Sequence, residues 1–222
     1  KPIFFCPGGE RFHWLKQQKR FSLKRVLLYV CEMLLAIATL HNHDVVYRDL
    51  KPENVLLDAE GHVKLTDFGL SKEGVSGAGS EQGTSTCCGT PEYLAPEILE
   101  NKGHGKAVDW WSLGTLMYEM LCGLPPFYDK NMKKMYDKIL HQEITFPEYV
   151  TPEAQSLLRG LLTRKVEDRL GSGDSDADEI KEHPFFDPID RGKVQGKRHT
   201  PAFAPPISAR SASGLGNNFD TE

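Results

Sequence analysis

Apolar positions recur at the spacing of buried helices in two long segments of the chain. In residues 22–42, apolar side chains return every three or four positions, and Ser22 precedes them as an N-cap. Residues 107–123 form a second such run, which closes with Gly123 and is followed by Leu-Pro-Pro-Phe. The pattern therefore predicts two long, well-buried helices.

Shorter patterns predict the remaining elements. Three further helices are expected at residues 131–141, 151–163 and 176–183. Strand-like pieces occur at 45–46, 55–57 and 62–65, and the last two are joined by the turn Asp-Ala-Glu-Gly. A mobile loop is expected over the Gly- and Ser-rich residues 71–88, and an extended tail beyond residue 187. The body should therefore be mainly helical, with a little strand.

Composition excludes several classes of protein. A chain of 222 residues with 39% hydrophobic residues can bury a sizeable core, as one large domain or two small ones. A net charge of −4 argues against a nucleic-acid partner, which would normally select a basic face. Five cysteines without a Cys-x-x-Cys pair favour a reduced compartment. With no membrane segment or signal-peptide pattern, we expect a cytoplasmic protein that could also enter the nucleus.

Residues 45–57, Val-Val-Tyr-Arg-Asp-Leu-Lys-Pro-Glu-Asn-Val-Leu-Leu, place a charged loop between two apolar pieces. Charged groups are costly to bury unless each has a partner, so one interpretation is simply a solvated loop. Two later motifs oppose that interpretation. Asp-Phe-Gly follows at 67–69, and Gly-Thr-Pro-Glu-Tyr-Leu-Ala-Pro-Glu follows the predicted mobile loop at 89–97. Each motif alone is weak evidence, but their order and spacing are highly specific.

In this order, the motifs resemble the catalytic domain of eukaryotic serine/threonine protein kinases. More narrowly, the chain resembles the AGC group, near the protein kinase B and serum- and glucocorticoid-regulated kinase branches. Tyr47 stands where most kinases have His, and Ala-Val-Asp-Trp-Trp-Ser-Leu-Gly reads nearly as that group's segment. Thr-Pro-Ala-Phe-Ala-Pro-Pro and Asn-Asn-Phe-Asp near the end of the chain are similar to its C-terminal extension.

The resemblance implies a mainly α, protein-kinase-like fold: a large helical C-lobe with short β-hairpins near the catalytic loop. It divides the chain into a partial kinase domain at 1–186 and part of the C-terminal extension at 187–222. Neither a Gly-x-Gly-x-x-Gly motif nor a Val-Ala-x-Lys strand is present, so the N-lobe is absent from this chain. We therefore expect a fragment of a non-specific serine/threonine protein kinase, with little activity in isolation.

The resemblance also assigns catalytic and cofactor-binding residues. Asp49 would take the proton of the acceptor hydroxyl, and Lys51 would meet charge that develops on the transferred group. Asn54 and Asp67 supply the hard oxygen ligands that Mg²⁺ requires. The ATP-binding set implied by the resemblance comprises Glu10, Glu53, Asn54, Asp67 and Phe219.

Further residues are expected to support the site. By the resemblance, Glu97 pairs with Arg169, Asp109 holds the backbone of the catalytic loop, and Thr90 bridges Asp49 and Lys51. Thr86 stands at the place of the activation-loop phosphosite, where a phosphate added by an upstream kinase would lie near Arg48. The alternative is a flexible loop with incidental hydroxyl groups.

Acidic positions predict the kind of protein substrate. Glu10, Glu53 and Glu119 match positions that receive arginines preceding the phosphorylated residue in basophilic members of the group, because carboxylates pair well with guanidinium groups. His41 and His43 form a His-x-His pair, but they end a predicted helix without a further ligand, so a metal site is not expected.

Two other functions were compared with a kinase. A non-catalytic, kinase-like module that binds basic peptides or a kinase partner would also fit a chain without an N-lobe, although the intact Asp49, Asn54 and Asp67 argue against it. An ATP-dependent enzyme acting on a small molecule fits poorly, because the Gly-Thr-Pro-Glu segment and the predicted loop suit a peptide substrate.

Overall fold

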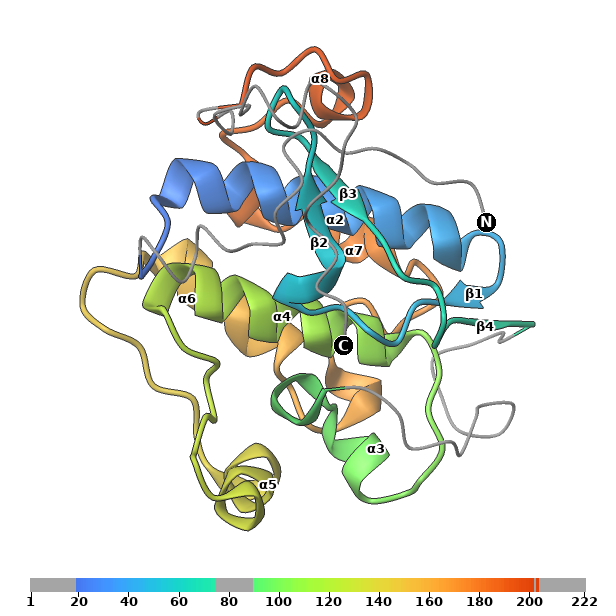
Figure 1. Ribbon diagram of the computed structural model, residues 1–222, viewed down its shortest axis with the longest axis vertical. Coiled ribbons are helices and arrows are strands. Elements are labelled where there is room, and N and C mark those ends of the chain that lie inside the picture. Colours follow the sequence, from blue (N-terminus) through green and yellow to red (C-terminus); the bar gives the residue numbers. More distant parts are fainter. Residues whose placement is uncertain (1–18, 75–89, 202, 204–222) are drawn as a thin grey trace, which may run out of the picture.

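The computed structural model describes residues 19–74, 90–201 and 203, and this part of the chain is mainly helical (Figure 1). Its α-helices are α2 (Leu23–His41), α3 (Pro96–Leu99), α4 (Ala107–Cys122), α5 (Met132–His141), α6 (Pro152–Leu161), α7 (Ala177–Lys181) and α8 (Arg191–Gln195). Short 3-10 turns are η1 (Pro52–Asn54), η3 (Pro91–Tyr93), η4 (Val166–Asp168) and η5 (Pro184–Phe186).

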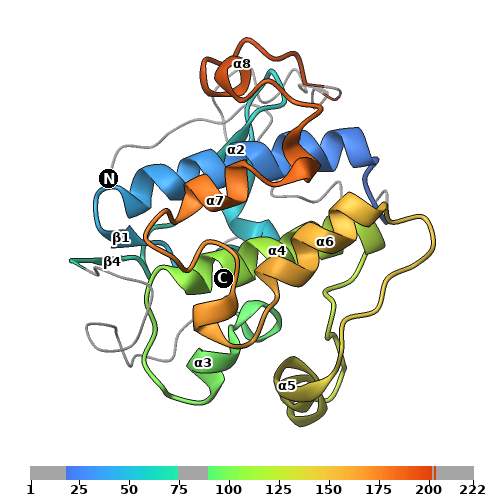
Figure 2. The ribbon, with the colours of Figure 1, turned by 180° about the vertical axis from the view of Figure 1, so that it is seen from behind.

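The long helices α2 and α4 pack against each other and form the centre of the body. Helix α6 packs on α4 and α7 packs on α2, both on the side of the molecule that Figure 2 shows. Val26, Val30 and Met33 form part of the apolar face of α2 and are fully buried. Burial of one such side chain contributes about 1.5–3 kcal/mol, so this interface fixes the position of α2 relative to α4.

Trp110 and Trp111 on α4 belong to the core, as their place in an apolar helix indicates. Both are fully buried. The ring of Trp111 stacks on Phe127 with 6.0 Å between centroids, and the guanidinium of Arg169 lies 5.2 Å from the Trp111 ring. The start of α4 is therefore anchored tightly in the body.

Two small antiparallel sheets position the charged loop. Strand β2 (Val55–Leu57) pairs with β3 (Val63–Leu65), and β1 (Val45–Val46) pairs with β4 (Lys72–Glu73). In the turn of the β2–β3 hairpin, Gly61 has a φ of +92°, which glycine adopts without steric cost. Because β1 precedes the charged loop and β2 follows it, both ends of the loop are held by strand pairing.

The predicted helices and the β2–β3 hairpin are confirmed, with boundaries shifted by one or two residues. The predicted N-cap position is confirmed. Ser22 occupies that position, but its side chain makes no capping hydrogen bond, and its carbonyl instead accepts the N–H groups of Arg25 and Val26. The short helix α3 was not predicted.

Two predictions about irregular segments are wrong in part. The expected loop at 71–88 begins with a strand, because Lys72–Glu73 pairs with Val45–Val46; residues 75–89 lie outside the described part. The expected extended tail beyond residue 187 contains α8, which packs on α2 and buries Val194. The proposed domain boundary at 186/187 stays a prediction. In the described ranges, no helix is both long and apolar enough to traverse a bilayer.

Gly123 provides a test of how α4 ends. Its φ is +91°, and a Cβ at this position would overlap the carbonyl oxygen of Lys19. We expect Gly123→Ala to lower the free energy of unfolding by about 1–3 kcal/mol, measured by chemical denaturation. Gly173→Ala is the matched control, because a Cβ there would meet nothing within 4 Å. Equal effects of the two substitutions would contradict this account.

Candidate functional site

Asp49 lies at the centre of the charged loop and is only 6% exposed. The side-chain amide of Asn54 donates to the Asp49 carbonyl at 2.8 Å and to Asp49 Oδ2 at 2.7 Å. Lys51 Nζ lies 3.0 Å from the same Oδ2. Asp49 Oδ1 is buried and has no hydrogen-bond partner in the described part of the chain. Because an unpaired buried acceptor is costly, Oδ1 is the atom prepared to receive a donor from a bound molecule.

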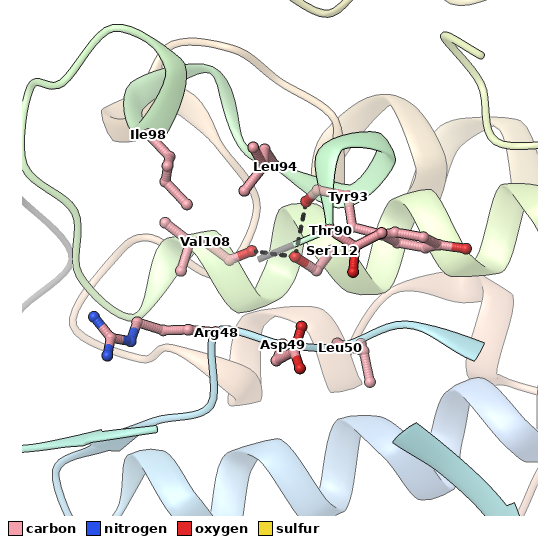
Figure 3. Close-up of a pocket in the computed structure, with 9 residues that line it drawn as sticks. All are labelled: Arg48, Asp49, Leu50, Thr90, Tyr93, Leu94, Ile98, Val108 and Ser112. Carbon is pink, nitrogen blue, oxygen red and sulfur yellow. Dashed lines mark hydrogen bonds between the residues drawn. The ribbon is translucent and has the colours of Figure 1, made fainter. Parts of the chain in front are cut away.

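Asp49 and Thr90 line the same small pocket (Figure 3). Arg48, Ser112, Tyr93 and apolar side chains complete its wall. The Ser112 hydroxyl contacts the carbonyl groups of Tyr93 and Val108, each at 3.1 Å. The expected bridge from Thr90 to Asp49 and Lys51 is not formed: these described residues share no hydrogen bond with Thr90. Thr90 instead forms part of the pocket wall.

Asn54 and Asp67 meet at one end of the β2–β3 hairpin. The register pairs Val55 with Leu65, and the Thr66 N–H donates to the Asn54 carbonyl at 2.9 Å, so Asp67 follows directly beside Asn54. Asp67 is exposed, has a φ of +56°, and accepts the Gly69 N–H at 3.1 Å. The local turn thus presents this carboxylate outward.

The donor set of Asn54 and Asp67 fits Mg²⁺ bound together with phosphates. Asn54 Nδ2 is engaged by Asp49, which leaves the amide oxygen of Asn54 as a ligand beside the Asp67 carboxylate. Among the described residues, no group of three or more His, Cys, Asp or Glu could hold a metal ion. Mg²⁺ commonly takes one or two protein oxygens and completes its shell with phosphates and water, so these two residues suffice.

Asp109 on α4 anchors the backbone of the charged loop. It is fully buried, and it accepts the N–H groups of Tyr47 and Arg48 at 2.8 Å each. The arrangement agrees with the support role that the family resemblance implied. Since Asp49 is the next residue, these bonds fix the start of the segment that carries it.

His41 was the least expected member of the site. It is 1% exposed, and its Nε2 lies 2.9 Å from Asp109 Oδ2 while its Nδ1 lies 2.9 Å from Asp176 Oδ2. Burial alone would lower the pKa of His41, but the hydrogen bonds to both carboxylates outweigh it and raise this pKa to about 9. No local sequence signal predicts this cluster, because Asp176 is 135 residues from His41.

Arg48 also keeps a buried donor. Its Nε donates to the Leu70 carbonyl at 2.7 Å, and its Nη1 is buried without a hydrogen-bond partner among the described residues. His104 is buried nearby, and both burial and the Arg48 charge lower its pKa. Thr86, the predicted source of a phosphate for Arg48, lies outside the described residues.

Glu97 and Arg169 form the buried ion pair that the resemblance implied. Arg169 Nη1 and Nη2 donate to the two carboxylate oxygens of Glu97 at 2.7 and 2.8 Å. Both residues are at most 5% exposed, and Arg169 also donates to the Ala107 carbonyl at 2.9 Å. The pair therefore joins α3 to the start of α4.

Two of the acidic residues assigned to substrate recognition, Glu53 and Glu119, lie close to Tyr93. Glu119 accepts a hydrogen bond from the Tyr93 hydroxyl, and Glu53 is exposed. Burial raises the pKa of Tyr93, and Glu119, Glu53 and Glu92 raise it further, so their charges lie close to this ring. Glu92 was missed by the sequence analysis. Glu10 and Phe219 lie outside the described residues.

Comparisons with known proteins agree with the motifs. The model of the protein kinase domain family matches residues 3–186. The chain is 55% identical over 205 residues to Protein kinase 2 of Dictyostelium discoideum, covering 92% of the chain and 42% of that protein. It is 50% identical over 220 residues to serine/threonine-protein kinase gad8 of Schizosaccharomyces pombe, covering 99% and 37%. Human RAC-beta serine/threonine-protein kinase is 48% identical over 205 residues, covering 92% and 42%. The chain thus spans less than half the length of these relatives.

The buried pair of Glu97 and Arg169 can be tested by stability. Glu97→Gln removes the counter-charge of a buried guanidinium, and we expect a loss of about 3–5 kcal/mol in chemical denaturation. Glu100→Gln is the matched control, because its partner Lys102 has a side chain that is 66% exposed. That control should change stability by less than about 1 kcal/mol. A small effect of Glu97→Gln would contradict the anchoring role.

His41 predicts a stability difference that depends on pH. Its pKa is about 9 in the folded chain against an ordinary value of 6.5, so its stabilising effect is complete below about pH 6.5. The effect should disappear as pH rises through about 9. The stability lost in His41→Gln, on the order of 3 kcal/mol at pH 6, should therefore shrink towards pH 9.5. His43→Gln, at an exposed position two residues after α2, is the matched control variant. A pH-independent difference for His41→Gln would refute this.

Proposed function

Because the chain belongs to the protein kinase family, and its relatives are kinases of the AGC group, we propose that it is the catalytic part of a serine/threonine protein kinase. The reaction is transfer of the γ-phosphate of ATP to Ser or Thr side chains of proteins. The observation that carries the proposal is Asp49, whose Oδ1 is buried and unpaired beside Lys51 and Asn54.

In this reaction the acceptor hydroxyl oxygen attacks the γ-phosphorus, and the bond from that phosphorus to the oxygen of ADP breaks. The hydroxyl proton passes to Asp49 Oδ1, which the hydrogen bond from Asn54 and the charge of Lys51 keep oriented. Lys51 also meets negative charge on the transferred group. Asn54 and Asp67 would hold Mg²⁺, which supplies neutralisation of phosphate charge when bound.

Regulation by phosphorylation follows from the same segment. An upstream kinase would add a phosphate to Thr86, and Arg48 would receive it. Support comes from the buried Nη1 of Arg48, which has no partner in the described ranges, and from the direct link of Arg48 to Asp109. A phosphate bound there would be coupled to Asp49 through one peptide unit.

The protein substrates would carry basic residues before the acceptor. Glu53, Glu92 and Glu119 support this, because their charges converge around Tyr93 at the edge of the pocket that holds Asp49. A guanidinium group can pair with two carboxylate oxygens at once, so arginine is the residue best suited to this surface.

Catalysis is tested with Asp49→Ala and Asp67→Ala in the protein at its natural length. We expect either substitution to lower kcat for a basic peptide by at least about 100-fold, because the proton acceptor or a metal ligand is lost. Circular dichroism should show both variants folded. Asp137→Ala, whose side chain is 75% exposed, is the control and should remain active.

Near-wild-type turnover in either variant would refute the assigned roles. If the unmodified protein binds basic peptides but transfers no phosphate from ATP and Mg²⁺, the function is that of a kinase-like binding module.

A further inference from the structure

Asp176 directly precedes α7, and its side chain extends into the interior of the body. Its Oδ1 accepts the indole N–H of Trp110 at 2.7 Å, and its Oδ2 lies 2.9 Å from His41 Nδ1. Its backbone has φ 44° and ψ −121°, a conformation that non-glycine residues rarely adopt. Such a residue persists only where its surroundings hold it, and here Trp110 and His41 do so.

The geometry around His41 requires a charged imidazole ring. Asp109 faces Nε2 and Asp176 faces Nδ1, each at 2.9 Å. An ionised carboxylate only accepts hydrogen bonds, and a neutral imidazole has a single N–H group. Only the imidazolium form of His41 can therefore donate to both residues. The Trp110 ring lies edge-on to the His41 ring at 4.8 Å and fixes its orientation.

The charge on His41 matters because Asp109 is fully buried. A buried carboxylate is strongly destabilising without a counter-charge, and the protonated ring of His41 is the cation that contacts it. Asp109 in turn holds the N–H groups of Tyr47 and Arg48, the two residues before Asp49. Loss of the proton from His41 would therefore loosen the backbone that positions Asp49.

We propose that Asp176 is a positioning residue for phosphate transfer: it keeps His41 protonated and, through Asp109, fixes the backbone that carries Asp49. The inference rests on the proposed kinase function and extends it to a residue at the far side of α4. Asp176 itself touches neither Asp49 nor the pocket.

The other charged groups around His41 do not replace Asp176. Lys106, at the start of α4, donates to the His41 carbonyl at 2.7 Å and pairs with Asp44 at 3.1 Å. The positive charge of Lys106 disfavours protonation of His41, and the negative charge of Asp44 offsets this effect. Asp109 and Asp176 are the carboxylates in direct contact with the ring.

The test compares Asp176→Asn with Asp178→Asn in the protein at its natural length. Asparagine keeps the shape of Asp176 but removes its charge, and its single oxygen can accept only one of the two donors, the indole N–H of Trp110 or the N–H of His41. Asp178, two residues further on, pairs with Lys181 at the surface and has a side chain that is 74% exposed. For each variant, kcat and KM for a basic peptide are measured from pH 6 to pH 10, and His41 is titrated by NMR in ¹³C-histidine-labelled protein.

We expect Asp176→Asn to lower the pKa of His41 from about 9 by at least about one pH unit, and to shift the alkaline fall of kcat equally. At pH 8.5 this should appear as a several-fold loss of kcat, with KM unchanged and little effect at pH 6.5. Asp178→Asn should match the unmodified protein throughout.

Several results would overturn the proposal. One is a His41 that titrates near 6.5 in the unmodified protein, a measurement that needs no folded variant. Another is a pH profile of Asp176→Asn that coincides with that of Asp178→Asn. If the unmodified protein transfers no phosphate at any pH, the proposed function fails instead, and the NMR titration still decides whether Asp176 controls His41.

Discussion

The buried carboxylate of Asp109 is the constraint on which the site depends. One side chain on α4 accepts the N–H groups of Tyr47 and Arg48 and also contacts His41 on α2. The charged loop has few apolar side chains of its own, so packing alone could not hold it. Hydrogen bonds to a charged acceptor inside the core provide that hold, since they strengthen where water is excluded. The position of Asp49 is therefore set by the packing of α2 on α4.

A second constraint acts from the other side of the loop. The β2–β3 hairpin lies against α2 and brings Asn54 and Asp67 to the same end, where Asn54 also holds Asp49. The charged loop is thus held between the helical core and the β2–β3 hairpin. Residues that would orient the acceptor hydroxyl and residues that would hold the metal ion share one hydrogen-bonded unit, which keeps their relative positions fixed.

The sequence predicted the local elements but not the contacts between residues that are far apart in the chain. Apolar periodicity located the long helices, and the charged loop with its Asp-Phe-Gly neighbour led, through the family resemblance, to the assignment of Asp49, Asn54 and Asp67, which stays a prediction. Contacts between distant positions could not be read in this way: His41 was interpreted as an ordinary helix-terminal histidine because its partner Asp176 lies far along the chain. The helix α8 was missed because its stretch is polar, and only its contact with α2 gives it a buried face.

The bonds from Tyr47 and Arg48 to Asp109 have a consequence for local opening of the chain. Loop amides usually exchange their hydrogens with solvent through small fluctuations that leave the core intact. These two amides donate to an acceptor that is itself enclosed between α2 and α4. Breaking their bonds without separating the helices would leave a buried charge short of donors. We therefore expect the start of the charged loop to belong to the slowest-exchanging cooperative unit of the body, although it is neither helix nor strand.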